Sequence, residues 1–463
     1  MKSVGIDDIE VYVPELYVNA TNFENARGME PGHMVHGVGI HKMSIPDSCD
    51  DAMTMGTMAA LRLIEKNNLS PSEIGRIDVA TESSLDESKG ANSYIIGMLE
   101  QVLGKGTLTH AGGVEKKFAC ASGGYATYDQ VNWIRSCEND GKMGIAIMTD
   151  IARYDLFSPG EYTQGAGAVA YLITDSPRLI SLEPKVTAFF VDNERDFFRP
   201  FGKSTAVVDG HYSNLCYLYA MRTAMVRWQE ASRKAGTINP KDGEAFLDYV
   251  DQLVFHIPYP RIAEHAAAFL FRHEWRKLPR WKEIVSGVGL EPMRDEPGSI
   301  DAILNDEEYM ESDKQFRKKF VKTPMFKQEF ETKIESSLIA SREIGNVYSA
   351  SLPLGLYGLF ENMYKSHNDL EGNRIGLGYY GSGCTALVTS GIVQEGYNDV
   401  TDKFDLMKRL DSRREISMSE YEDLHEGRLS LDNPIISPSG KFVLSDIGKS
   451  GNTEGYRYYK FVE

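Results

Sequence analysis

The sequence predicts an α/β protein built from two similar halves. Apolar runs typical of strands alternate along the chain with amphipathic patterns typical of helices. One order of elements occurs twice: a strand with a polar residue at its end, a small-residue turn that enters a helix, and a glycine-containing pair of strands. The chain of 463 residues is long enough to bury a core in both halves. We therefore expect two αβ halves related by a pseudo-twofold axis.

The first half comprises residues 1–175. We expect its elements in this order: a strand at 3–13, a loop-rich region at 20–50, a helix at 51–66, a strand and its exit loop within 70–88, a helix at 92–102, a turn and helix from 118, and strands within 141–150 and 165–174. Glu82 stands just beyond the carboxyl end of one strand, where α/β folds present catalytic groups. Taken alone, Glu82 is better explained as an exposed loop residue, so its role depends on the rest of the site.

The second half, residues 176–395, follows the same order. A strand at 248–258 ends on His256, as the earlier strand ends on Glu82. A small-residue turn then enters a helix at Asn346, and a strand, a Gly-Ser-Gly turn and a strand follow. The residues that should face the shared cleft therefore come from both halves.

Two regions have no counterpart in this repeat. More positions separate His256 from Asn346 than separate the corresponding residues of the first half, and the surplus lies at 272–327, a charged, proline-containing and helix-prone stretch. We interpret it as a helical insertion in the second half. Residues 396–463 are polar with aromatic clusters, and we expect a helical and β appendage there.

The stretch FACASGGY at 118–125 places Cys120 where an apolar segment turns into a helix. Unpaired amides and the macrodipole at a helix N-terminus favour a thiolate, so we expect a lowered pKa and a nucleophile. The glycines allow a thioester carbonyl to come close to the backbone. The competing interpretation is that Cys120 is a small buried hydrophobe, which is the usual role of a free cysteine.

Composition excludes several classes of function. A net charge of −17 argues against nucleic-acid binding and against docking on anionic membranes. Five scattered cysteines without a CxxC pair indicate a reducing compartment, and the histidines show no metal-ligand spacing. No apolar run approaches the length of a membrane-spanning helix, and the N-terminus is not a secretory signal. We expect a cytoplasmic protein with no metal and no cofactor.

A thiol, a carboxylate, an imidazole and an amide in one cleft suit carbon–carbon bond formation on thioesters. Cys120 would carry the acyl group, because a thiolate exchanges readily with a thioester. Glu82, with a pKa raised by burial, would remove a proton from the carbon next to the carbonyl. His256 would protonate the resulting alkoxide. Asn346 would donate a hydrogen bond to a thioester oxygen.

Motifs along nearly the whole chain resemble the 3-hydroxy-3-methylglutaryl-CoA synthase family of the thiolase superfamily. They occur in the order that this family has: FACASGGY, TDIARYDLFSPGEYTQGAGAVAYLI, DFFRP, VVDGHYS, FHIPYPRIAEHA, GNVYSASL, YYGSGCTA and the tail RLDSRREISMSEYEDL. The resemblance implies a five-layered αβαβα fold and a homodimer. It also implies condensation of acetyl-CoA with acetoacetyl-CoA in the mevalonate route to isoprenoids.

The same resemblance implies roles for particular residues. Cys120 matches the acetylated nucleophile, Glu82 the general base and His256 the general acid. The positions that match substrate-binding residues are Asn346 and Ser382 for the acetoacetyl thioester, Tyr154 and Thr163 for the acyl pocket, and Arg261 for the CoA phosphates. Packing at the edge of the core explains Tyr154 and Thr163 equally well. Arg261 replaces a lysine, which keeps the cation but changes its shape.

Three other functions stay open on the sequence. A type III β-ketoacyl synthase also uses Cys, His and Asn, but it makes its carbanion by decarboxylation and needs no base at Glu82. A β-branching synthase would have the same residues and act on a polyketide held on acyl carrier protein. A non-catalytic scaffold for a thiolase or another partner would be expected to lose one of the three catalytic residues, and all are present.

The insertion carries its charges in blocks. Basic residues cluster at 272–282, acidic ones at 306–313 and basic ones again at 314–322. Local salt bridges are the simpler explanation. The functional alternative is that a basic cluster guides CoA phosphates, or an acidic carrier protein, to the cleft.

Overall fold

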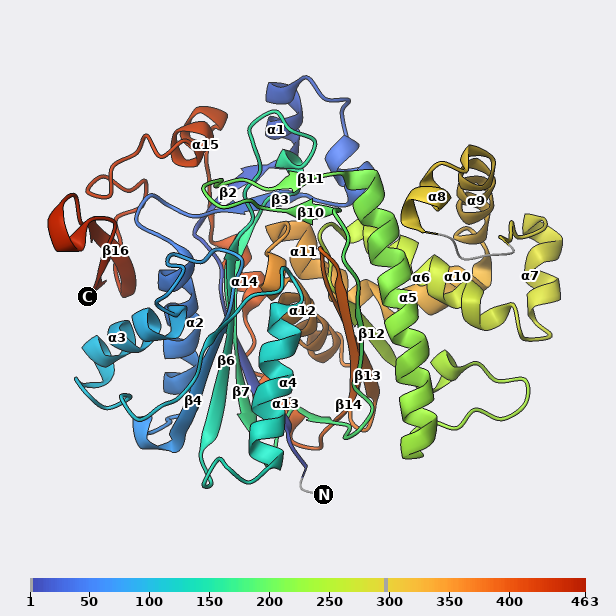
Figure 1. Ribbon diagram of the computed structural model, residues 1–463, viewed down its shortest axis with the longest axis horizontal. Helices are drawn as coiled ribbons and strands as arrows, with labels where there is room; N and C mark the ends of the chain where they lie inside the picture. Colours follow the sequence, from blue (N-terminus) through green and yellow to red (C-terminus); the bar gives the residue numbers. More distant parts are fainter. Residues whose placement is uncertain (1–2, 295–298) are drawn as a thin grey trace.

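The computed structural model describes residues 3–294 and 299–463, and in this part of the chain ten strands form one sheet. Its order is β12-β13-β14-β8-β1-β7-β6-β4-β5, and β9 pairs with one end of β14 (Figure 1). The bounds are Gly5–Tyr12 (β1), Ile74–Ala80 (β4), Glu115–Lys116 (β5), Met143–Ile151 (β6), Ala166–Thr174 (β7), Ile180–Leu182 (β8), Ala188–Val191 (β9), Gln252–Phe255 (β12), Arg374–Gly381 (β13) and Thr385–Val393 (β14).

The two halves pair their strands in the same pattern. In the first half β4 is parallel to β6, β6 is antiparallel to β7, and β7 is antiparallel to β1. In the second half β12 is parallel to β13, β13 is antiparallel to β14, and β14 is antiparallel to β8 and β9. The pairing of β1 with β8 joins the halves edge to edge. The internal repeat expected from the sequence is therefore a repeat of strand topology.

Helices form three layers around these strands (Figure 1). On one side α2 (Ala52–Lys66) packs on β1, β6 and β7, and α3 (Ala91–Leu103) packs on α2 and β4. In the middle lie α4 (Ser122–Arg135) against β4, β6 and β7, and α12 (Ser351–Lys365) against β12 and β13. On the far side α5 (Gly210–Ala235) covers β9, β13 and β14, and α6 (Pro260–Trp275) packs on α5. The five-layered αβαβα prediction is confirmed.

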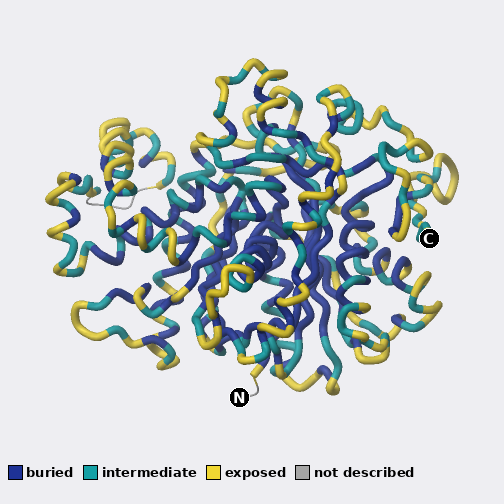
Figure 2. Tube along the Cα trace, turned by 180° about the vertical axis from the view of Figure 1, so that it is seen from behind, coloured by how far each residue is buried: buried dark blue, intermediate teal, exposed yellow. Residues whose placement is uncertain are grey.

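Burial follows these layers. The middle helices and the inner faces of the strands form one apolar cluster, and the two outer layers each form another. In Figure 2 the central strands and helices are dark blue, whereas exposed segments are confined to the periphery. The ends of α4 and α12 thus meet deep inside the molecule, where charged groups lose hydration and change their pKa.

The region 20–50 is more regular than expected. It contains α1 (Ala20–Arg27), a π-helical turn (His33–Val38) and β3 (Lys42–Ile45), which pairs with β2 (Leu16–Asn19). Asn19 caps α1 by accepting from the amide of Thr21. The loop-rich prediction is wrong for these elements, and the small sheet that orders them also includes β15 (Arg414–Glu415), which pairs with β2.

The insertion and the C-terminal residues are also built from short elements. The insertion consists of the end of α6, α7 (Trp281–Val288), α8 (Ile300–Leu304), α9 (Glu307–Phe320) and the start of α10 (Pro324–Lys333), and its residues 295–298 lie outside the described part. Residues 396–463 hold α13 (Tyr397–Thr401), α14 (Leu406–Asp411), β15, α15 (Met418–His425) and a hairpin of β16 (Lys441–Ile447) and β17 (Arg457–Val462). Among the described residues, no helix is long and apolar enough to cross a membrane.

Candidate active site

Cys120 lies in a tight turn directly before α4. Ala119 has a φ of 43°, a left-handed conformation that costs energy for a residue with a Cβ, and this turn directs the chain into the helix. The two glycines that follow let other segments of the chain approach the backbone of this turn closely. A Cβ at Gly123 would lie 2.8 Å from the carbonyl oxygen of Ser349, and a Cβ at Gly124 would lie 2.7 Å from the ring of Tyr379. The small residues of the motif thus let the two halves meet at Cys120.

Glu82 lies against this thiol. Sγ of Cys120 donates to Oε1 of Glu82 at 2.9 Å, and both side chains are buried. Burial, together with the negative charge of Asp150, raises the pKa of Glu82 to about 8. Burial and the nearby Glu82 carboxylate also raise the pKa of the Cys120 thiol well above its ordinary value. The expected lowering of the thiol pKa by the helix is therefore wrong, because desolvation and a like charge outweigh the macrodipole.

Asp150, which the sequence did not single out, holds the two halves together at this point. The residue is fully buried at the end of β6. One of its oxygens accepts from Thr81 Oγ1 at 2.9 Å and from the amide of Glu82 at 2.7 Å, and the other accepts from the amide of Ser349 at 3.0 Å. Glu82 follows β4, whereas Asp150 is the next-to-last residue of β6, so the sequence marks Asp150 only by its place near the end of a buried strand of the same sheet.

His256 follows β12 in the second half, as predicted. Its backbone amide donates to the carbonyl of Gly378 at 2.8 Å, and its ring stacks at 6.5 Å on that of Tyr380. Nδ1 is buried without a hydrogen-bond partner among the described residues. Burial lowers the pKa of His256 to about 3, so its imidazole is neutral at physiological pH. A neutral imidazole still has one N–H to donate.

Asn346 is held with its amide carbonyl already occupied. Oδ1 accepts from the amide of Tyr348 at 2.9 Å and from Ser351 Oγ at 3.0 Å. This orientation leaves Nδ2 as the group that can donate to a substrate oxygen. The side chain is buried, so such a bond would form away from bulk water.

Ser382 lies on the turn between β13 and β14, next to the nucleophile turn. A Cβ at the preceding Gly381 would lie 2.5 Å from the carbonyl oxygen of Phe118. The buried Asp196 fixes this turn by accepting from the amide of Gly383 at 2.8 Å and from Tyr380 Oη at 2.7 Å. Asp196 opens the DFFRP motif, but this structural role was not predicted, since the residue lies outside the repeated strand ends.

Tyr154 belongs to the same apolar cluster as Cys120. Its ring packs edge-on against those of Tyr348 and Phe197, each with centroids 6.4 Å apart. Thr163 lies beside it, donates from Oγ1 to the carbonyl of Gly160, and accepts from the amide of Asn346 at 2.9 Å through its own carbonyl. Tyr154 thus packs in the same cluster as the thiol, and the acyl-pocket role of Tyr154 and Thr163 stays a prediction.

Arg261 lies elsewhere, in the first turn of α6. Its guanidinium contacts Glu264 at 3.2 Å and donates to the carbonyl of His36 at 2.6 Å. It does not line the cavity that contains Glu82. Its expected contact with CoA phosphates stays a prediction.

A cavity of about 1190 Å³ reaches Glu82, which contacts the thiol, but its lining does not include Cys120, His256 or Asn346. Its lining includes Glu82, Ala119, Phe197, Arg199, Ser382 and Arg457. Arg199 donates to the carbonyl oxygen of Glu82, so the motif that contains it reaches the site as well. The volume is sufficient for a thioester with a long arm, since small-ligand sites occupy about 300–1,000 Å³.

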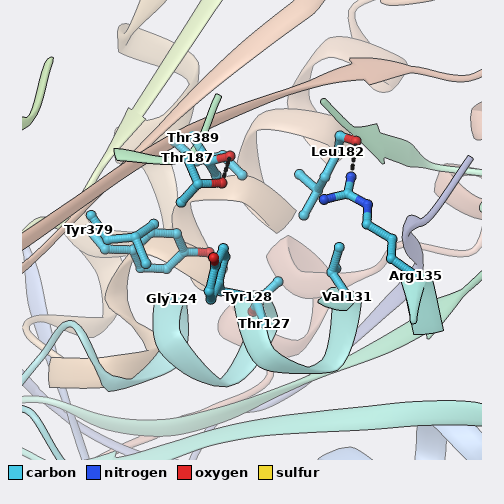
Figure 3. A pocket seen from close by; sticks show the side chains of 11 residues that line it. Gly124, Thr127, Tyr128, Val131, Arg135, Leu182, Thr187, Tyr379 and Thr389 are labelled. Atoms are coloured by element: carbon cyan, nitrogen blue, oxygen red, sulfur yellow. Dashed lines mark hydrogen bonds between the residues drawn. The ribbon is translucent and has the colours of Figure 1, made fainter. Parts of the chain in front are cut away.

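A second cavity, of about 10 Å³, lies further along α4 (Figure 3). Thr187 and Thr389 share a hydrogen bond of 2.9 Å at its edge, and Arg135 donates to the carbonyl of Leu182 at 2.6 Å. This volume holds about one water molecule, so the cavity is no substrate site.

Comparison with known families decides the identity of the site. The N-terminal model of hydroxymethylglutaryl-coenzyme A synthase matches residues 1–177, and the C-terminal model matches residues 180–432. The chain belongs to the hydroxymethylglutaryl-CoA synthase family. It is therefore an enzyme of this family, as the motifs predicted.

Relatives in the hydroxymethylglutaryl-CoA synthase family match over the whole chain. The Hydroxymethylglutaryl-CoA synthase of Haloferax volcanii is 33% identical over 468 residues, covering 100% of both chains. That of Saccharomyces cerevisiae is 30% identical over 432 residues, covering 91% of this chain and 81% of the relative. The structure of MvaS in complex with 3-hydroxy-3-methylglutaryl coenzyme A has 30% identity and a TM-score of 0.82, and a structure of HMG-CoA synthase complexed with CoA has 26% identity and a TM-score of 0.73. Both cover 100% of both chains, and the fold is thiolase-like.

Proposed function

We propose that this chain joins acetyl-CoA and acetoacetyl-CoA into 3-hydroxy-3-methylglutaryl-CoA through an acetyl group carried on Cys120. The observation that supports this most is the 2.9 Å contact between Sγ of Cys120 and Oε1 of Glu82 at the wall of a large cavity. A nucleophile and a base within hydrogen-bond distance are what covalent acyl transfer requires.

Acylation comes first. Glu82 accepts the thiol proton as Sγ of Cys120 attacks the carbonyl carbon of acetyl-CoA, and CoA leaves with a proton. A carboxylate with a pKa of about 8 is a strong enough base for this step near neutral pH. The proton with which CoA leaves comes from Glu82, which passes it to the departing CoA thiolate and so becomes the base again.

Condensation follows on the second substrate. Glu82 removes a methyl proton from the acetyl group, and the enolate adds to the ketone carbon of acetoacetyl-CoA. His256, a neutral imidazole because its pKa is about 3, gives its N–H proton to the alkoxide that forms, and the proton that Glu82 took from the methyl group afterwards restores the N–H of His256. Asn346 donates from Nδ2 to the thioester oxygen. Water then cleaves the bond to Cys120 and frees the product, so the chemistry needs no metal and no redox cofactor.

The cellular setting is part of the same proposal. The substrates are free CoA thioesters, the reaction serves the mevalonate route, and the enzyme works in the cytoplasm as a homodimer. β5 is the outer strand of the sheet, so pairing with β5 of a second copy would continue the sheet across the dimer. Sedimentation that gives a stable monomer at micromolar concentration would contradict the dimer.

The test is incubation of the purified chain with both thioesters. Mass spectrometry should identify 3-hydroxy-3-methylglutaryl-CoA, and treatment with acetyl-CoA alone should add one acetyl group to the peptide that contains Cys120. Acetylation found only on Cys137, Cys216 or Cys384 would reject the mechanism. Product formed from malonyl thioesters instead would favour a decarboxylating synthase.

A further inference from the structure

The loop that carries Tyr154 is bound to the C-terminal part of the chain through buried hydrogen bonds. The backbone amide of Tyr154 donates to Oε1 of Gln164 at 2.6 Å, and Nε2 of Gln164 donates to Oη of Tyr421 at 2.6 Å. Tyr421 lies on α15 and is 1% exposed, and Gln164 is 3% exposed. A residue near the end of the chain is thus two hydrogen bonds away from the wall of the acyl pocket.

Tyr421 is itself held by an ion pair. Its hydroxyl donates to Oε1 of Glu161 at 3.0 Å, and Glu161 is 1% exposed. Arg27, at the end of α1, binds both oxygens of Glu161 and also donates to Glu422 on α15 at 2.7 Å. Burial and Glu161 raise the pKa of the Tyr421 phenol well above its ordinary value, so the hydroxyl keeps its proton.

A second residue of α15 binds the other backbone group of Tyr154. Nε2 of His425 lies 2.8 Å from the carbonyl oxygen of Tyr154. A carbonyl only accepts, so Nε2 carries the hydrogen. The carbonyl of His425 in turn accepts from Arg153, which lines the large cavity. Both the amide and the carbonyl of Tyr154 are therefore fixed by the same helix.

The segment between these contacts also reaches Asn346. The carbonyl of Thr163 accepts from the amide of Asn346 at 2.9 Å. A Cβ at Gly345 would lie 2.1 Å from the carbonyl oxygen of Gln164, so the two segments are packed without spare room. A shift of Gln164 would therefore displace both the acyl-pocket tyrosine and the amide donor.

Resting on the proposed function, we propose that Tyr421 is a positioning residue that sets the size of the acyl pocket of Cys120. Through Gln164 it holds Tyr154 against Tyr348 and Phe197, and this keeps the pocket closed to acyl groups larger than acetyl. A buried polar network has few alternative arrangements, because each unpaired group costs its full desolvation. The C-terminal appendage thereby determines acyl specificity without contacting the substrate.

The test is Tyr421→Phe, which removes only the hydroxyl. Acylation of Cys120 by acetyl-CoA and by propionyl-CoA is followed by intact mass in separate and competing reactions. We expect the rate with acetyl-CoA to fall about tenfold, the size of effect that loss of one buried hydrogen bond produces. We expect the rate with propionyl-CoA to fall less or to rise, so that the propionyl-to-acetyl ratio increases.

Tyr364→Phe is the matched control, since Tyr364 Oη donates to Asp402 at 2.8 Å on the surface. This variant should keep the wild-type ratio. If Tyr421 acts through Gln164, the double variant with Gln164→Ala should show the same ratio as Gln164→Ala alone. Should Tyr421→Phe fail to fold, His425→Ala gives the same readout through the carbonyl of Tyr154.

The outcomes separate the two proposals. A lower melting temperature with an unchanged propionyl-to-acetyl ratio would overturn the positioning role and leave Tyr421 a purely structural residue. Wild-type protein that is not acetylated on Cys120 would overturn the proposed function, and the positioning role with it. A higher propionyl-to-acetyl ratio in Tyr421→Phe, with the wild type acetylated normally, supports both, and a lower ratio would contradict the positioning role.

Discussion

The two halves of the molecule share a strand topology but contribute opposite kinds of group to the site. The first half supplies Glu82, Cys120 and Asp150, a buried set in which Asp150 raises the pKa of Glu82, and Glu82 and Asp150 raise that of Cys120. The second half supplies His256 and Asn346, which are neutral donors. The duplicated topology therefore places residues at equivalent strand ends, whereas the charged groups around them decide whether a half supplies a carboxylate base or neutral donors.

Removing the thiol should have the largest effect on activity, because both steps of the proposed reaction take place on an acyl group bound to Cys120. Cys120→Ala is expected to abolish acetylation and turnover, because Cys120 is the cysteine that contacts Glu82. Intact mass after treatment with acetyl-CoA measures the first loss, and product formation measures the second. Turnover that persists in Cys120→Ala would show that the first half does not carry the acyl group.

Removing the base should separate acetylation from condensation. In Glu82→Gln, Cys120 should still become acetylated on long incubation, but condensation should fall by about 10²–10⁴-fold, as loss of a general base does. In the wild type, condensation should rise as pH increases through about 8, because Glu82 acts when ionised. Near-normal condensation in Glu82→Gln would exclude it as the base.

The same carboxylate should make stability depend on pH. Its pKa is raised from 4.5 in the unfolded chain to about 8 in the folded one, so the folded state binds the proton more tightly between these values. The free energy of unfolding should therefore fall as pH rises from 4.5 to 8 and then level off. Glu82→Gln should flatten this slope in urea titrations at several pH values, and an unchanged slope would contradict the raised pKa.

Removing the neutral donor of the second half should affect only the later step. His256→Ala should leave acetylation of Cys120 near normal and lower condensation by about 10²–10³-fold, the effect of losing one oxyanion donor. Because the pKa of His256 is about 3, the wild-type rate should show no step from this residue between pH 5 and 7. A step there that disappears in His256→Ala would show that the imidazole titrates after all.

A substitution at Asp150 measures how much its hydrogen bonds between the two halves contribute to the free energy of unfolding. Asp150→Asn replaces an acceptor by a donor opposite the amide of Glu82 or of Ser349. The free energy of unfolding should fall by about 1–3 kcal/mol, the cost of one unsatisfied buried group. Asp423→Asn, on the surface beside Arg428, should change it by less than about 0.5 kcal/mol. Equal effects of the two variants would show that Asp150 is no such link.

The smallest effect should come from the insertion. Arg272 and Arg276 of its first basic cluster both pair with Glu291, and Lys314 of the second lies 3.7 Å from Glu311. None of these residues lines the large cavity. Neutralising Lys314 with the basic residues at 317–319 should therefore change the KM for thioesters by less than about twofold, as expected of surface charges. A KM that rises strongly, and less steeply with salt than in the wild type, would revive the steering hypothesis.

Part of the site was readable from the sequence because its residues follow recognisable elements. Glu82 and His256 come directly after buried strands, and Cys120 comes directly before a helix with small residues. Asp150 also lies near the end of a buried strand, but its role was not predicted. That role depends on hydrogen bonds to both halves, and a sequence pattern does not show which groups a side chain will bind. The sign of the pKa shift of Cys120 also escaped prediction, because it depends on how close a distant carboxylate comes.

Contacts across long sequence separations were beyond prediction. Arg261 binds the carbonyl of His36, 225 positions earlier, a contact that no local pattern indicates, and its contact with CoA stays a prediction. Within 20–50, β3 pairs with β2, and β2 in turn pairs with β15 near residue 414, so the sheet that orders this segment includes a strand that its own sequence does not indicate. Local patterns predict which segments form, whereas such pairings depend on the whole chain.

The contact between Cys120 and Glu82 also protects the enzyme between turnovers. Peroxide and alkylating reagents attack a thiolate, and oxidation to sulfenic acid follows thiolate character and exposure. Cys120 is held as S–H in a buried site, whereas Cys137 is exposed. In the proposed mechanism the resting thiol therefore reacts slowly with such reagents, and it becomes a nucleophile only when a thioester is bound and Glu82 takes its proton.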